Sequence, residues 1–154
     1  MIHVKGSMVL AALILFSTSL AWTVAGTTAG EAVVTKDGEA EKTSRREESL
    51  RICVKRVCET LAKDDFKAFQ AFVDDPDMTK QYGEMTWGET AFARMKEIQA
   101  KEDYLKLLVD QIPTQREKIE KGVFTLGGHA HGHLHIEMKE ADGTWRIARF
   151  KFCR

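Results

Sequence analysis

The sequence predicts an α+β domain in which helices come first and an antiparallel β-sheet comes last. Up to about residue 121, apolar residues recur at three- and four-residue spacing, as in amphipathic helices. After Gly122 the pattern changes to alternation with glycine-containing turns. Helices followed by consecutive strands are typical of α+β folds. The chain has 154 residues, 44% of them hydrophobic, which is enough for one domain.

The first 25 residues have the pattern of a signal peptide. Lys5 precedes an apolar run over 8–20, and residues 7–30 carry no charge. The strongly apolar part is shorter than the ~20 residues that span a bilayer, and Ala25 offers a small residue for cleavage. We therefore expect 1–25 to be removed and the protein to be secreted or periplasmic, without a membrane contact afterwards. An uncleaved membrane anchor is the alternative.

The domain itself is expected over 44–154. Residues 26–43 are small, polar and charged, which predicts a disordered leader. Ser44 with Glu47 three residues later makes a capping box, and the sequence predicts a helix over about 44–62. The apolar stripe of this helix is Leu50, Val54, Val57 and Leu61.

Further helical segments follow. Asp64 or Asp65 can cap a short helix that ends before the turn at 75–77. Its apolar residues are Phe66, Phe69, Phe72 and Val73. Residues 78–88 stay open between a loop and a short strand. A long helix is predicted over 89–111, ended by Pro113, with a polar helical turn over about 115–121.

Three strands are predicted at the end of the chain. They cover 123–126, 129–139 and 144–153, with a turn at Gly127-Gly128 and a hairpin signal at Asp142-Gly143. The hairpin signal leaves the register of the last two strands open.

Two registers of these strands are possible. Pairing Met138 with Ile147 would place Phe150 and Phe152 beside the histidines described below. Pairing Glu137 with Ile147 is preferred, because both phenylalanines then share a face with Leu134 and Ile136. In that register, Lys151 and Arg149 lie beside His133 and His135, and such cations weaken metal binding and favour an anion.

Four histidines alternate along the middle strand: His129, His131, His133 and His135. Strand geometry puts all four on one face, together with Glu137. Two neighbouring imidazoles can bind one Zn or Cu ion, but the whole ladder cannot, because its ends are ~20 Å apart. A plain solvent-exposed face is favoured; a metal site and the polar wall of a ligand pocket are the alternatives.

The chain has three cysteines. Cys53 and Cys58 are about 140° apart around the predicted helix and ~7.5 Å apart along it, too far for a disulfide. In an oxidising compartment we expect Cys153 to pair with Cys53 or Cys58, leaving one thiol over. Three buried free thiols are the alternative.

The end of the chain carries a family resemblance. Residues 142–147, Asp-Gly-Thr-Trp-Arg-Ile, resemble the closing hairpin of many secreted members of the nuclear transport factor 2-like and SnoaL-like superfamily. Residues 61–66 and the element order over 44–154 are similar as well. The resemblance implies a cystatin-like cone. It also implies either a ligand-binding or assembly role, or an activity like that of ketosteroid isomerase or scytalone dehydratase. No residue matches the catalytic aspartate or tyrosine of those enzymes.

These observations predict a non-enzymatic, exported binding or interaction domain that uses its histidine face for a transition metal or a small anion. The alternative is a small lyase or isomerase with His133 or His135 as general base, which would need a closed pocket. Lys+Arg and Asp+Glu each number 23 and no basic run occurs, so a nucleic acid is not expected. The partner is then a small ligand or a protein, and a homodimer stays open.

Overall fold

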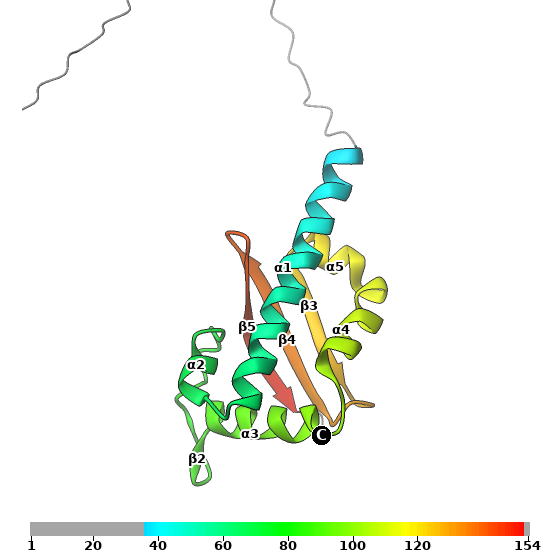
Figure 1. The fold of residues 1–154 in the computed structure, drawn as a ribbon. Helices are drawn as coiled ribbons and strands as arrows, with labels where there is room; N and C mark the ends of the chain where they lie inside the picture. The colour runs from blue at the N-terminus through cyan, green and yellow to red at the C-terminus, as the bar shows by residue number, and fades with distance from the viewer. Residues whose placement is uncertain (1–35, 153–154) are drawn as a thin grey trace, which may run out of the picture. The chain divides into compact units, whose positions relative to one another are not determined.

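The computed structural model describes residues 36–152. The described chain is an α+β fold, as predicted, and Figure 1 shows its helices lying against a three-stranded antiparallel sheet. The helices are α1 Lys36–Ala62, α2 Phe66–Gln70, α3 Trp87–Gln99, α4 Tyr104–Gln111, the 3-10 turn η1 Pro113–Gln115 and α5 Arg116–Glu120. The strands are β1 Gln81–Tyr82, β2 Met85–Thr86, β3 Val123–Gly128, β4 Leu134–Ala141 and β5 Thr144–Phe152. Within 36–152, no helix combines the length and apolarity needed to cross a membrane. The predicted signal peptide and Cys153 lie outside the described residues.

Helix α1 begins earlier than the sequence suggested. The prediction of a disordered leader is wrong over 36–43, which are helical. Thr43 is only 3% exposed, and its hydroxyl donates a hydrogen bond to the carbonyl of Glu39. Ser44 therefore lies inside the helix, where no capping box is needed. The predicted end of the helix at Ala62 is confirmed.

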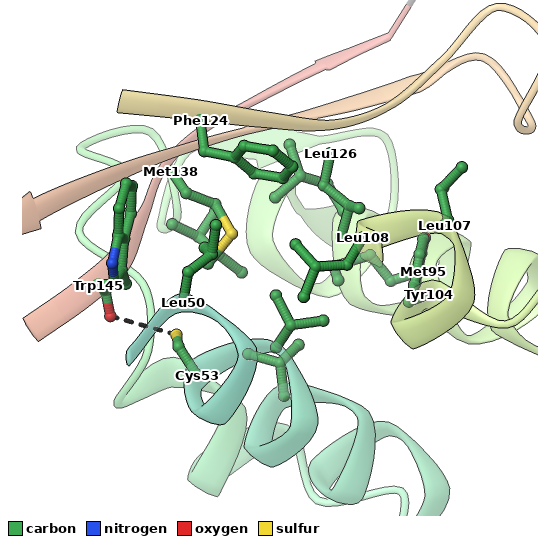
Figure 2. Packing of buried hydrophobic residues seen from close by; sticks show 14 of the residues in the cluster. Leu50, Cys53, Met95, Tyr104, Leu107, Leu108, Phe124, Leu126, Met138 and Trp145 are labelled. Atoms are coloured by element: carbon green, nitrogen blue, oxygen red, sulfur yellow. Dashed lines mark hydrogen bonds between the residues drawn. The ribbon is translucent and has the colours of Figure 1, made fainter. Parts of the chain in front are cut away.

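The predicted apolar stripe of α1 faces the core. Leu50, Val54, Val57 and Leu61 are all at most 3% exposed. Figure 2 shows Leu50 and Cys53 of α1 close to Trp145 and Met138 of the sheet. The indole Nε1 of Trp145 donates a hydrogen bond of 3.0 Å to the carbonyl of Arg46, which fixes α1 against the β4–β5 hairpin.

The segment after α2 covers the free edge of β5. Asp65 caps α2, as one of the two predicted alternatives, by accepting a hydrogen bond from Ala68 N. Ile147 of β5 exchanges backbone hydrogen bonds of 2.8 Å with Phe72 and Asp74. The Asp75 carboxylate, 5% exposed, accepts a bond of 3.0 Å from Phe150 N. The edge of β5 is thus paired within the chain.

The single helix predicted over 89–111 is wrong. The chain forms α3 and α4, which are separated by 100–103. A capping box of Thr86 and Glu89 starts α3 after the small β1–β2 hairpin. Asp103 starts α4 by accepting a bond of 2.8 Å from Leu105 N. The break lets both helices turn apolar side chains toward the same core.

Two glutamine side chains cover the free edge of β3. The Gln111 amide bonds both N and O of Gly127, at 3.3 and 3.2 Å. The Gln115 amide bonds both N and O of Thr125, at 3.0 and 2.7 Å. Gln111 ends α4 and Gln115 ends η1, and their amides meet positions two residues apart, ~6.8 Å, on the strand.

A β-bulge sets the register of β4 and β5. Met138 pairs with Ile147 near the hairpin, but beyond the bulge Glu137 pairs with Arg149. Ala148 is the extra residue of β5. The preferred register, Glu137 with Ile147, is therefore wrong, and its alternative holds only on the hairpin side of the bulge.

The bulge nevertheless restores the predicted division of the faces. Beyond it the pairs are His135 with Lys151, Ile136 with Phe150 and Leu134 with Phe152. Both phenylalanines therefore share the inner face with Leu134 and Ile136, as the preferred register required. His135 has a lysine as its neighbour on the outer face.

Candidate functional site

The predicted strand over 129–139 is too long at its start. β3 continues through the predicted turn to Gly128, and β4 begins only at Leu134. Residues 129–133 form a loop between them, which we call the histidine loop. Gly132 has φ of +76° and His133 has φ of +59°, values that a regular strand does not contain. The strict alternation of four histidines on one strand face is therefore absent.

Glycine is required where the histidine loop leaves the sheet and where it packs on α3. A Cβ on Gly127, at φ +91°, would lie 2.2 Å from the carbonyl oxygen of Leu134. One on Gly132 would lie 2.6 Å from the side chain of Ile98. The loop is thus held close to the neighbouring backbone and to α3.

Two polar contacts tie the histidine loop to the helices. Arg94 of α3 donates a hydrogen bond of 3.0 Å to the carbonyl of Gly132. The Nδ1 atom of His131 lies 2.7 Å from a carboxylate oxygen of Glu102. His131 is therefore occupied by a carboxylate, on the side of the loop that faces the α3–α4 turn.

Of the other three histidines, His129 lies close to both His133 and His135. The ring centre of His129 lies 5.6 Å from that of His133 and 5.9 Å from that of His135, with the ring planes nearly perpendicular. His129 and His133 are exposed and His135 is half-buried. We call these three the histidine cluster. The histidine loop forms the cluster by turning the chain so that His129 lies near His133 and His135. Strand periodicity could not predict this turn.

The spacing of the histidine cluster is close to that of shared metal ligands. Two imidazoles on one tetrahedral ion, at about 2 Å per bond, have ring centres about 5 Å apart. Within residues 36–152 no group of three or more His, Cys, Asp or Glu side chains is already arranged to hold an ion. Each observed pair would have to close by less than about 1 Å, and the exposed ring of His129, which belongs to both pairs, can move by rotamer adjustment.

Glu137, the fifth predicted ligand, is engaged elsewhere. One of its carboxylate oxygens lies 2.9 Å from the ammonium group of Lys151 and the other 3.5 Å from that of Lys139. The pKa of Glu137 is lowered, mainly by the hydrogen bond from Lys151. The carboxylate is therefore charged, but its oxygens already have cationic partners.

An open groove of about 470 Å³ lies beside the cluster and shares His135 with it. It is lined by Gln115, Lys118, Thr125, Gly127, His135, Glu137 and Lys151. Lys118 and Gln115 come from the α5 region, and sequence analysis did not single them out. Only the tertiary fold brings them to the sheet, so no local pattern could have identified them.

Within the described residues Cys53 and Cys58 form no disulfide, and they do not pair with one another, as predicted. The thiol of Cys53 donates a bond of 3.2 Å to the carbonyl of Trp145, drawn in Figure 2. The thiol of Cys58 points to Gln99 Oε1 at 3.6 Å. Burial raises the pKa of Cys53 to about 11 and that of Cys58 to about 12, so neither is a reactive thiolate.

The predicted disulfide of Cys153 stays a prediction, because Cys153 is not among the described residues. Cys53 contacts Trp145 near the start of β5, whereas Phe152 ends the strand about 23 Å further along. Cys53 therefore does not lie beside the end of β5 that leads to Cys153.

Known protein families, curated proteins and solved structures were compared with the chain. None matches. The histidine cluster and the groove are therefore interpreted from their own chemistry.

Proposed function

We propose that this chain is an exported binding domain that captures a Zn²⁺ or Cu²⁺ ion with the histidine cluster. One observation carries the proposal: the His129 ring lies within 6 Å of two other imidazole rings, at 5.6 and 5.9 Å. Imidazole nitrogen is a preferred ligand of both ions. The proposal of export rests on the signal-peptide pattern of residues 1–25.

The surroundings of the cluster support an open, modest site. Three imidazoles leave at least one coordination position for water or a ligand, and the carboxylate of Glu137 is held by two lysines. Lys151 also pairs with His135 across the strands, and its positive charge opposes a bound cation. We therefore expect weaker binding than at a closed structural zinc site.

The cluster is better suited to binding than to general-base catalysis. His129 and His133 are exposed, and the groove beside His135 is open. An isomerase or lyase would need a covered pocket with an acid facing the histidine. The likeness of the closing hairpin to nuclear transport factor 2-like proteins is compatible with a binding role, and membership of that superfamily is likewise a proposal.

Calorimetric titration of the mature protein with Zn²⁺ and Cu²⁺ tests the proposal. His129→Gln should abolish binding, because His129 is the ring shared by both pairs, and His133→Gln or His135→Gln should weaken binding at least about tenfold. His131→Gln is the matched control, since its ring is engaged with Glu102. Binding should weaken at acidic pH, because protons compete with the metal for the imidazole nitrogens. Unchanged affinity in His129→Gln would contradict the proposal.

A further inference from the structure

Positive charge gathers on the outer face of the sheet, on the side away from the helices. Lys139, Arg149 and Lys151 all point outward from β4 and β5 and are exposed. Among the described outward positions of these two strands, Glu137 is the one carboxylate. Arg146 also points outward but is paired with Asp74 at 3.3 Å.

The groove extends this charge beyond the strands. Lys118 of α5 and Lys151 of β5 both line it, with Gln115 and Thr125 among the other lining residues. The cations therefore come from three separate elements: α5, β4 and β5. Arg149 and Lys151 are two residues apart on β5, so their roots are ~6.8 Å apart. Lys151 lies on the outer face and also lines the open groove, so the positive charges form a row from Arg149 through Lys151 to Lys118.

We propose that this outer face binds a linear polyanion carrying phosphate or sulfate groups, with Lys118, Arg149 and Lys151 as its contacts. The match is one of charge and shape. Consecutive anionic groups of a polymer can meet consecutive cations, and each contact releases condensed counterions, which makes the binding dependent on salt. A single small anion would use only part of the row.

Glu137 limits this site. It lies opposite Arg149 and is bonded to Lys151 and Lys139, so it neutralises part of the charge that the polymer would meet. Removing the carboxylate should therefore tighten polyanion binding. If this face bound only a metal ion, neither the wild type nor this variant would bind a polyanion detectably.

The experiment measures binding of the mature protein to a heparin octasaccharide, to sodium polyphosphate and to inorganic phosphate between 50 and 300 mM KCl. Arg149→Gln/Lys151→Gln should lower the affinity for the polymers about tenfold or more at the lowest salt and flatten the salt dependence. Glu137→Gln should raise it about threefold. Lys55→Gln/Lys106→Gln is the matched control, because it removes the same charge from exposed positions on α1 and α4. Thermal unfolding of each variant confirms that it is folded.

The polymer that binds more tightly shows whether the site prefers sulfate groups or phosphate groups. Three results would overturn the proposal: no binding of either polymer, equal losses in the control variant, or inorganic phosphate binding as tightly as the polymers. The inference is independent of the metal proposal, because Lys151→Gln alone should weaken polyanion binding while strengthening metal binding at the histidine cluster.

Discussion

The inner and outer faces of the three-stranded sheet differ in what constrains their side chains. Eight residues of the inner face are at most 3% exposed: Phe124, Leu126, Leu134, Ile136, Met138, Trp145, Ile147 and Phe150. They pack against α1, α3 and α4 in one cluster (Figure 2). The outer face carries Thr125, His135, Glu137, Arg149 and Lys151, and these are half-buried or exposed. Packing determines the first set, so the second set is free to carry ligand chemistry.

Truncating one residue of each face gives the largest expected contrast. Ile136→Ala removes a side chain that is 1% exposed and should lower the free energy of unfolding by about 2–5 kcal/mol. Its neighbour His135 points outward, so His135→Ala should cost less than about 0.5 kcal/mol. Urea denaturation followed by circular dichroism measures both. Equal costs would mean that the outer face is also packed.

The covered edge of β3 should respond next. Gln111→Ala and Gln115→Ala each remove two hydrogen bonds to the edge of β3, and each should cost about 1–2 kcal/mol. The double variant exposes a strand edge and should self-associate in sedimentation velocity. Gln81→Ala is the control, because the Gln81 amide bonds only Gly83. A monomeric double variant of unchanged stability would contradict this account of the edge.

The smallest effect concerns the two helix thiols, whose pKa values burial raises to about 11 and 12. In the unfolded chain the thiols have their ordinary pKa of 9.0, whereas in the folded chain both keep their protons to higher pH. The stabilisation is therefore complete only well below pH 9, begins to be lost as the pH approaches 9, and is lost further as the pH rises toward 11–12. Between pH 7 and 9 we expect a loss on the order of 1 kcal/mol.

Urea unfolding of Cys153→Ser at several pH values measures this loss, and Cys53→Ala/Cys58→Ala should flatten the profile. Native protein should also react slowly with a thiol reagent at pH 8 and quickly once denatured. Fast reaction of the native thiols would show that the α1 side of the core is open to solvent.

Local patterns predicted what local physics determines. The apolar stripe from Leu50 to Leu61 fixed the buried face of α1, Asp65 capped α2 as expected, and Asp142-Gly143 made the hairpin between β4 and β5. Alternation also predicted which side chains of β4 and β5 face inward and which face outward, although it did not predict the register of the two strands.

Contacts between distant segments account for what the sequence missed. The bulge in β5 lies beside Asp75. The Asp75 carboxylate accepts a hydrogen bond from Phe150 N, which is 75 residues away in the sequence. The histidine loop alternates histidine with small residues, so it has the period of a strand, yet Gly132 and His133 adopt positive φ and turn the chain. Helix α1 starts before its predicted first residue, and Thr43 in that extra part is buried. Neither propensity nor periodicity contains these contacts.

Histidine imidazole nitrogens observed by long-range ¹H–¹⁵N correlation spectroscopy during a Zn²⁺ titration test the central claim most directly. The cluster predicts that one ring nitrogen each of His129, His133 and His135 shifts to the position of a metal-bound nitrogen at the same zinc equivalent, while the signals of His131 stay near their starting values because Glu102 holds its ring. If His131 shifts together with the others, or if no ring nitrogen of His129 changes, the three imidazoles of the histidine cluster do not act as one site.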